Sequence, residues 1–383
     1  MLRVLTAGES HGQALTAIIE GLPAGLELDL TRINCLVRRR QGGYGRGTRM
    51  KIEKDRVEIL SGVRGSVTLG TPLTLVIYNR DWENWQEIMA VGPEAKLTER
   101  VVHSPRPGHA DLAGGLKYRQ TDLRNILERA SARETAIRVA VGAIAAELLA
   151  CLGIKVQGQV VAIGDVQASG EVKIGEDKLL YGNPLYCVDQ EASLLMIKAI
   201  EEAKKRGDSL GGVVQVIAEG VPVGLGSHVQ WDRRLDGRLA QALMSIPAIK
   251  GVEIGKGFST ASLFGSQVHD EIEYQEGQGF RHRTNHAGGI EGGISNGETL
   301  VLRAAMKPIP TLTQPLASVD WHTKKPTVAA VERADVCAAP AAAIVAEAVV
   351  AWVLAVVVTE KFGGDHFEET LLNYRNYVEQ IKK

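Results

Sequence analysis

The longest helical pattern in the sequence is Asp122–Leu152, which reads DLRNILERASARETAIRVAVGAIAAELLACL. Its apolar residues recur at three- and four-residue steps, the spacing that places them on one face of a helix. Thr121 or Asp122 can cap the first turn, and Gly153 follows as an end signal. We therefore expect one helix over this whole stretch.

Short β-type runs and further helical patterns alternate on both sides of this segment. Strands bounded by glycine or proline are expected at Leu2–Thr6, Leu15–Glu20, Leu73–Tyr78, Val213–Glu219, Gly251–Ile254 and Thr299–Arg303. Helices are expected at Ala192–Arg206, Arg233–Ile246, Pro340–Val358 and Phe367–Ile381. The pattern predicts a mixed α+β fold, and no low-complexity linker divides the chain.

Two ten-residue segments resemble each other. Ala17–Leu26 reads AIIEGLPAGL and Val216–Leu225 reads VIAEGVPVGL. In each, a strand leaves through a Gly/Pro turn toward a helix. The similarity suggests a duplicated unit, although two ordinary strand exits could match in this way.

The composition is that of a folded soluble protein. Of 383 residues, 45% are apolar and 23% are charged, and the net charge is -1, which excludes a uniformly basic nucleic-acid coat. Any basic site must be local. The 42 glycines indicate many tight turns, or backbone that lies close against ligands.

Cysteine spacing and apolar runs indicate the compartment. The four cysteines are far apart and form no Cys-x-x-Cys pair, so we expect neither zinc nor a disulfide framework. The apolar run Ala348–Val358 has 11 residues, whereas a membrane span needs about 20, and this favours a buried core helix. Glu9 and His11 interrupt the N-terminus before a signal peptide could form. A cytoplasmic protein is expected.

An arginine-rich segment lies between Thr31 and Met50 and contains no acidic residue. Its arginines are Arg32, Arg38, Arg39, Arg40, Arg46 and Arg49. Glycines around Tyr44 allow the backbone to close on a ligand, and guanidinium groups bind phosphate or carboxylate with two parallel hydrogen bonds. A small-molecule anion site is one interpretation. A solvated basic loop and an RNA-binding segment are the others.

Two turns carry a histidine. Gly8–Gly12 (GESHG) places Ser10 beside His11, and Arg106–Asp111 (RPGHAD) places His109 three residues after an arginine. Histidine is the natural proton donor near neutral pH, although either residue could be structural. Two such turns in a chain that also has an arginine cluster favour a catalytic site.

Four further segments could bind or relay. Arg129 and Arg133 are four residues apart, which on one helix gives them a common face. The glycine-rich loop 285–293 lacks both the dinucleotide and the P-loop spacing, but its backbone could hold a flat ring or a phosphate. Lys307–Thr311 (KPIPT) sets a cation and a hydroxyl on a stiff proline scaffold. Asp335 could relay a proton or pair with Arg333.

Together these segments resemble a known family. They match, in order, the signature segments of chorismate synthase at Gly8–Gly12, Arg38–Arg49, Arg106–Asp111, Arg129–Thr135, Asn285–Gly293, Met306–Thr311 and Arg333–Pro340. The resemblance implies a βαβα sandwich that forms one domain over 1–383, and a homotetramer. It also implies conversion of 5-enolpyruvylshikimate 3-phosphate to chorismate by anti-1,4-elimination of phosphate with reduced FMN.

The same resemblance implies roles for individual residues. Around the substrate anions it places Arg40, Arg46, Arg49, Arg106, Arg133 and Arg333. His11 would protonate the departing phosphate, His109 would lie near the flavin, and Ser10 and Asp335 would relay the substrate proton through flavin N5. The flavin contacts would be Arg129, Ala130, Ser131, Pro247, Ala248, Gly292, Lys307, Pro308, Ile309, Pro310, Thr311 and Arg333. No metal is implied.

Some positions differ from the family pattern. Pro247 stands where the family often has Asn or Gln, which removes a polar flavin contact. Thr48 and Glu291 occupy positions where Gly and an apolar residue are common, and neither is assigned a role.

Two other classes of protein predict different behaviour. A flavin oxidoreductase with net hydride transfer would consume NAD(P)H steadily, but the sequence has no nicotinamide fingerprint. Similar proteins bind a nicotinamide dinucleotide near Arg40 and Arg46, so NADPH as a reductant, or a separate flavin reductase, stays open. An RNA-binding protein would bind with strong salt dependence. Only 5% of the residues are aromatic, which argues against recognition by base stacking.

Overall fold

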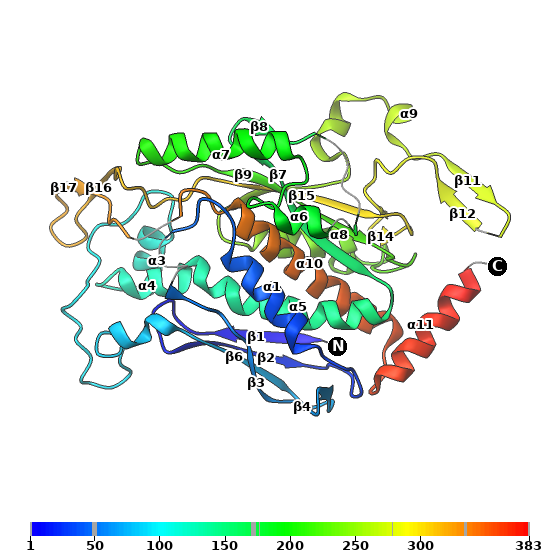
Figure 1. The fold of residues 1–383 in the computed structure, drawn as a ribbon, viewed down its shortest axis with the longest axis horizontal. Helices are drawn as coiled ribbons and strands as arrows, with labels where there is room; N and C mark the ends of the chain where they lie inside the picture. Colours follow the sequence, from blue (N-terminus) through cyan, green and yellow to red (C-terminus); the bar gives the residue numbers. More distant parts are fainter. Residues whose placement is uncertain are drawn as a thin grey trace.

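The computed structural model describes residues 2–47, 52–169, 174–175, 177–277, 279–332 and 335–381. Two antiparallel sheets enclose a layer of long helices, and a further helix covers the outer face of the second sheet (Figure 1). The layers therefore follow the order β, α, β, α. This agrees with the mixed α+β fold that the sequence predicts.

The first sheet has the strand order β1-β2-β6-β3, with β1 at Arg3–Ala7, β2 at Ala14–Glu20, β6 at Leu73–Tyr78 and β3 at Glu58–Ser61. The second has the order β10-β15-β9-β7-β8. Its strands are β7 at Lys155–Ile163, β8 at Val166–Gln167, β9 at Gly212–Glu219, β10 at Ile249–Ile254 and β15 at Leu300–Met306. All six predicted strands are present.

Four helices pack between the sheets: α1 (Leu30–Gln41), α5 (Thr135–Cys151), α8 (Leu235–Met244) and α10 (Ala339–Phe362). The outer helix is α7 (Gln190–Lys205). Although α10 is long and apolar enough to cross a membrane, 83% of its most apolar window is buried. A Cβ at Gly142 of α5 would lie 2.3 Å from the carbonyl oxygen of Ala348. Only glycine therefore allows α5 and α10 to pack this closely.

The remaining helices and strands lie in the segments between these layers, except α11, which follows α10 near the C-terminus. The helical ones are η1 (Arg80–Asn84), α3 (Asp111–Tyr118), α4 (Arg124–Ala130), η2 (Ala132–Glu134), α6 (Asp177–Gly182), η3 (Trp231–Arg233), η4 (Gly257–Ser262), α9 (Gly265–Val268) and α11 (Phe367–Ile381). The strands are β4 (Val63–Arg64), β5 (Val67–Thr68), β11 (Ile272–Gln275), β12 (Gly279–His282), β13 (Ile290–Glu291), β14 (Ile294–Ser295), β16 (Ala317–Val319) and β17 (Pro326–Val328).

The two halves of the chain repeat one arrangement. The order β1-β2-β6-β3 in the first sheet corresponds to β7-β9-β15-β10 in the second, and α5 and α10 follow equivalent strands. The similar ten-residue segments leave β2 and β9 through equivalent turns. In one turn the Thr68 hydroxyl donates to Pro23 O and accepts from Leu26 N, and in the other the Ser295 hydroxyl bonds Pro222 O and Leu225 N in the same way. This correspondence supports an internal duplication.

The prediction of one helix over Asp122–Leu152 is wrong at its middle. Ser131 has extended backbone angles (φ -66°, ψ 140°) and its side chain accepts from Arg133 N, which ends α4 and begins a new helical turn. Ser131 and Glu134 have the Ser-x-x-Glu spacing that marks a helix start. Arg129 and Arg133 therefore do not share one continuous helix face.

Candidate active site

His11 lies in the loop between β1 and β2, against α4. Its Nδ1 is 2.8 Å from Glu128 Oε1, and its backbone N–H donates to Glu128 Oε2 at 2.7 Å. The imidazole stacks on Trp85 with ring centroids 3.9 Å apart. Burial raises the pKa of Glu128, but the hydrogen bonds and charge of His11 more than offset this and hold the pKa below its usual value. An ionised Glu128 only accepts hydrogen bonds, so Nδ1 of His11 carries the proton between them.

The break at Ser131 brings several predicted residues to the same loop. Ser10 Oγ donates to Ser131 Oγ at 3.1 Å, and Ser10 N donates to Glu128 O. Arg129 reaches back to the end of β1, where it donates to Gly8 O at 3.0 Å. The predicted flavin residues Arg129–Ser131 are therefore neighbours of the predicted catalytic residues Ser10 and His11.

A second cluster is centred on Arg106, which is 5% exposed. Its guanidinium donates to both oxygens of Asp111 and to the Thr311 hydroxyl, while Nδ1 of His109 lies 2.6 Å from Asp111 Oδ1. Burial raises the pKa of Asp111, but the hydrogen bonds from His109 and Arg106 outweigh burial and hold it far below the usual range. Asp111 therefore carries a full negative charge between two basic groups.

The KPIPT segment adjoins this second cluster. Lys307 Nζ donates to Gly108 O, and Lys307 N donates to Ala248 O at 2.9 Å. Ala248 has a left-handed backbone with φ of 70°, and Pro247 precedes it. Four predicted flavin positions, Pro247, Ala248, Lys307 and Thr311, are thus gathered beside His109.

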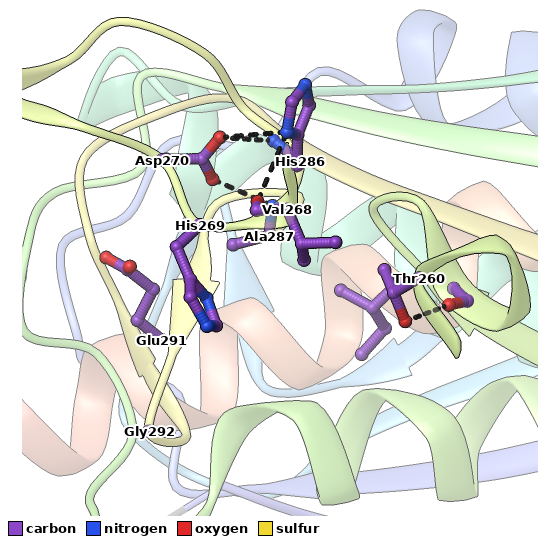
Figure 2. Close-up of a pocket in the computed structure, with 10 residues that line it drawn as sticks. Thr260, Val268, His269, Asp270, His286, Ala287, Glu291 and Gly292 are labelled. Atoms are coloured by element: carbon purple, nitrogen blue, oxygen red, sulfur yellow. Dashed lines mark hydrogen bonds and ion pairs between the residues drawn. The ribbon is translucent and has the colours of Figure 1, made fainter. Parts of the chain in front are cut away.

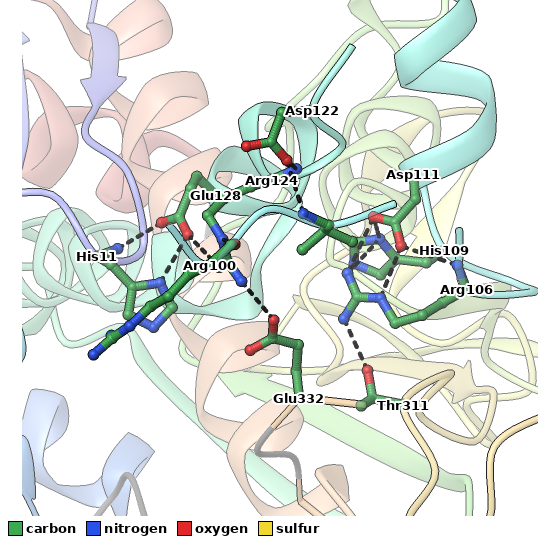
Figure 3. A network of polar contacts seen from close by, with 11 residues as sticks. His11, Arg100, Arg106, His109, Asp111, Asp122, Arg124, Glu128, Thr311 and Glu332 are labelled. Carbon is green, nitrogen blue, oxygen red and sulfur yellow. Dashed lines mark hydrogen bonds and ion pairs between the residues drawn. The ribbon is translucent and has the colours of Figure 1, made fainter. Parts of the chain in front are cut away.

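The segment Arg100–Arg106 connects the two histidine clusters (Figure 3). Arg124 Nε donates to Arg100 O, and Val102 N donates to Asp122 at 2.9 Å. Arg124 also contacts Glu128 at 3.3 Å and Glu332 at 2.8 Å. Loops that are distant in the sequence therefore place both histidines in one region of the molecule.

Arg40 and Arg133 belong to a buried cluster of charged side chains near the loop that carries His11. Arg133 Nη1 donates to both oxygens of Asp55, at 2.6 and 2.7 Å, and Arg40 Nη1 is 3.5 Å from the same carboxylate. Burial lowers the pKa of Arg40 to about 9, with Asp55 acting in the opposite direction, so it is still charged at pH 7. Arg133 Nη2 lies 3.6 Å from Glu53 Oε2, so both guanidinium groups already face buried carboxylates, although Arg40 Nη1 and Arg133 Nη2 make no hydrogen bond among the described residues.

Arg46 and Asp335 form an ion pair. Arg46 Nη1 is 2.6 Å from Asp335 Oδ2, and Gly47 N donates to Asp335 Oδ1 at 2.6 Å. The arginine-rich loop is thereby fixed to the start of the α10 segment. Arg49 and Arg333 lie outside the described residues.

Gly292 lies apart from the other predicted flavin positions. Its loop meets the C-terminal end of β10, where Lys256 N donates to His286 O, whereas Ala248 precedes the first residue of that strand. Gly292 faces a cavity of about 370 Å³ that is also lined by His269, Asp270 and His286 (Figure 2). Within this subunit the structure does not bring Gly292 to Lys307.

Glu128, Trp85, Asp55 and Glu53 are site residues that the sequence analysis missed. The spacing of Arg124 and Glu128 signals a helix ion pair, but nothing local pairs Glu128 with a histidine 117 positions away. Among the described residues, no group of three or more His, Cys, Asp or Glu is placed to hold a metal ion.

Comparison with known proteins agrees with this geometry. The family model for chorismate synthase matches residues 2–359. A chorismate synthase from Moorella thermoacetica is 65% identical over 384 residues, and one from Desulforamulus reducens is 60% identical over 387, each covering 100% of both chains. A crystal structure of chorismate synthase superimposes with a TM-score of 0.80 at 46% identity, covering 100% of this chain and 98% of the other.

The fold and these relatives define the chain as a lyase of aromatic amino acid biosynthesis. The chain belongs to the chorismate synthase family.

Proposed function

We propose that this chain converts 5-enolpyruvylshikimate 3-phosphate into chorismate by anti-1,4-elimination of phosphate, using reduced FMN. The observation that carries the proposal is the convergence of two histidines, each with Nδ1 against a buried carboxylate, in a region rich in guanidinium groups. The reaction needs a proton donor for the leaving phosphate and cations for its charge. Both are present.

The substrate carries a phosphate and two carboxylates, about four negative charges at pH 7. Arg40, Arg46, Arg49, Arg106, Arg133 and Arg333 would neutralise them. The position of Arg40 and Arg133 side by side around Asp55 supports this assignment, because guanidinium groups bind phosphate and carboxylate oxygens with paired hydrogen bonds. A positioned donor to developing charge contributes about 3 kcal/mol to catalysis.

Residues of the chain would handle both proton transfers. His11 gives a proton to the departing phosphate. Ser10 and Asp335 carry away the proton that the ring loses, and Arg46 and Gly47 hold the Asp335 carboxylate in place. His109 lies on the flavin side of the site with Arg106.

The donor set fits a reduced flavin mononucleotide. Arg129 and Lys307 would be cations for its phosphate, and Ala248, in a left-handed turn, accepts a hydrogen bond from Lys307 N. Residues 129–131, 247–248 and 307–311, together with Gly292 and Arg333, would hold it. Bound there, reduced FMN supplies electron density to the breaking C–O bond and recovers it when the proton is lost, so the reaction has no net redox change.

We further propose that the chain acts as one functional domain in a homotetramer in the cytoplasm. The outer face of the first sheet is uncovered in the subunit: Leu5 is 74% exposed, Ile18 48% and Tyr78 48%, and their strand register places them on one face. An apolar sheet face of this kind is suited to a second copy. NADPH, acting near Arg40 and Arg46, or a separate flavin reductase would regenerate the reduced flavin.

The test is anaerobic incubation of the protein with dithionite-reduced FMN and the enolpyruvyl substrate. Phosphate and chorismate should form in equal amounts, without steady consumption of NAD(P)H. Net hydride transfer, or no phosphate release, would refute the proposal.

A further inference from the structure

His11 is clamped on two sides by residues outside the segments that suggested the function. Glu128 accepts hydrogen bonds from both Nδ1 and the backbone N–H of His11, and Trp85 stacks on the imidazole at an interplanar angle of 23°. The Glu128 side chain is 1% exposed and that of His11 is 11%. Since Nδ1 is occupied, Nε2 is the ring nitrogen left to meet a ligand.

Glu128 is itself fixed by a chain of charges. Arg124 Nη1 contacts its Oε1 at 3.3 Å, and Arg124 Nη2 donates to Glu332 at 2.8 Å. Two other charged groups lie close to this stack in the described part of the chain: Arg100, whose guanidinium lies 4.1 Å from the Trp85 ring centroid, and Asp81, whose Oδ2 accepts from Trp85 Nε1 at 3.2 Å. Arg124 is thus shared between two carboxylates. It therefore neutralises the Glu128 carboxylate only in part, and Glu128 still attracts the His11 ring.

We propose that Glu128 is the positioning residue for His11, and this rests on the proposed function. It holds the ring with Nε2 toward the substrate and accepts the hydrogen bond from Nδ1. In the step, the Nε2–H bond breaks and its proton passes to a phosphate oxygen while the C–O bond breaks with its electron pair on the leaving phosphate. The electron pair of the ring C–H bond, whose proton passes to Ser10 and Asp335, completes the second double bond of the ring. The imidazole is then neutral, still donates from Nδ1 to Glu128, and regains its proton from water.

The first test is Glu128→Gln, which keeps the side-chain size and removes the charge. Without the carboxylate, His11 Nδ1 loses its acceptor and the ring is no longer held with Nε2 toward the substrate. We expect kcat to fall roughly tenfold to a hundredfold, with the KM for the substrate and the Kd for FMN changed by less than about twofold. Glu128→Asp, which restores the carboxylate, should recover part of the lost kcat.

A matched control and a double variant separate positioning from folding. Glu147 is another buried glutamate that pairs with an arginine, Arg32, but contacts no histidine, so Glu147→Gln should leave kcat and KM unchanged. In a His11→Ala background, Glu128→Gln should lower kcat by less than twofold, because the two residues act as one unit.

The role of Glu128 can fail independently of the elimination reaction. A wild-type kcat in Glu128→Gln, or an equal fold-loss of kcat with and without His11, would overturn that role while leaving the elimination reaction intact. Absence of chorismate from the wild-type protein would instead overturn the proposed function. A tautomer measurement by 15N NMR gives a readout independent of activity, and it should find the proton on Nδ1 in the neutral ring.

Discussion

Nδ1 of His11 lies 2.8 Å from Glu128 Oε1, and Nδ1 of His109 lies 2.6 Å from Asp111 Oδ1. The two pairs differ in how each carboxylate is shared. Asp111 receives the Arg106 guanidinium at 2.8 and 3.1 Å, so its charge is matched by a permanent cation. Among the described residues, the permanent cation that contacts Glu128 is Arg124, at 3.3 Å, and Arg124 also binds Glu332. The His11–Glu128 pair is therefore arranged around the histidine, and the His109–Asp111 pair around the Arg106 guanidinium.

The largest expected effect tests the first pair. His11→Ala should lower kcat at least about a hundredfold, because a positioned acid contributes that much to a proton transfer. The Kd for FMN should stay within about twofold, since the predicted flavin residues contact Ser10 and Gly8 rather than the His11 ring. Stopped-flow measurement of chorismate formation provides the rate. His228→Ala, an exposed histidine in another loop, is the matched control, and an unchanged rate in His11→Ala would remove His11 from the mechanism.

The second pair should matter more for stability. Asp111→Asn leaves Arg106 buried without its ionised partner, which typically costs about 3 kcal/mol. Because the folded pKa of Asp111 is lowered, its contribution is present above the unfolded value of about 3.9 and is lost as the pH falls below it. We therefore expect the variant to be less stable at pH 7 and to lose less stability between pH 5 and pH 2.

Urea unfolding at fixed protein concentration measures this difference. Asp236→Asn is the control, since the side chains of the Arg234–Asp236 pair are 40% and 28% exposed and solvent-accessible pairs contribute less than about 1 kcal/mol. Equal destabilisation by the two variants would contradict the view that the second pair is organised around a buried arginine.

His109→Ala should have an intermediate effect of a different kind. Gly108, its neighbour, accepts from Lys307, and Ala248 accepts from the backbone of Lys307, so the histidine turn supports the proposed flavin site. We expect about tenfold weaker binding of reduced FMN and about tenfold lower kcat/KM at limiting FMN. Anaerobic fluorescence titration measures the Kd. If His109→Ala kept normal flavin affinity but lost kcat a hundredfold, the two histidines would be equivalent, which would contradict the difference between the two pairs.

Local patterns in the sequence predicted most of the fold. Burial alternates along Leu15–Glu20, as in the period-two pattern of a half-buried strand, and the last helix begins at Phe367 as predicted. The break at Ser131 was missed because the apolar spacing continues through it, while the signal for a new helix start is the short Ser-x-x-Glu spacing of Ser131 and Glu134.

The candidate site was predictable where its partners are close in sequence. Arg106, His109 and Asp111 belong to one turn and were found together. Glu128 was not, because its contact with His11 depends on how α4 packs against the β1–β2 loop. For Gly292 the prediction came from the family resemblance, which placed it at the flavin. The structure puts its loop at the other end of β10 from Ala248. In the proposed homotetramer, a second copy of the chain would have to supply Gly292 to a flavin site.

The smallest expected effect concerns the stacking of Trp85 on His11. Trp85→Leu keeps an apolar side chain but removes the aromatic face, and such a contact contributes about 1 kcal/mol, so kcat should fall about fivefold with FMN affinity unchanged. Trp85→Phe restores a ring and should recover most of the rate. No residue of the His109 pair is among the ring stacks found in the described part of the chain, so this substitution separates the two pairs without altering a charge. If Trp85→Leu weakened flavin binding as strongly as His109→Ala, the His11 ring would have to lie on the flavin side of the site.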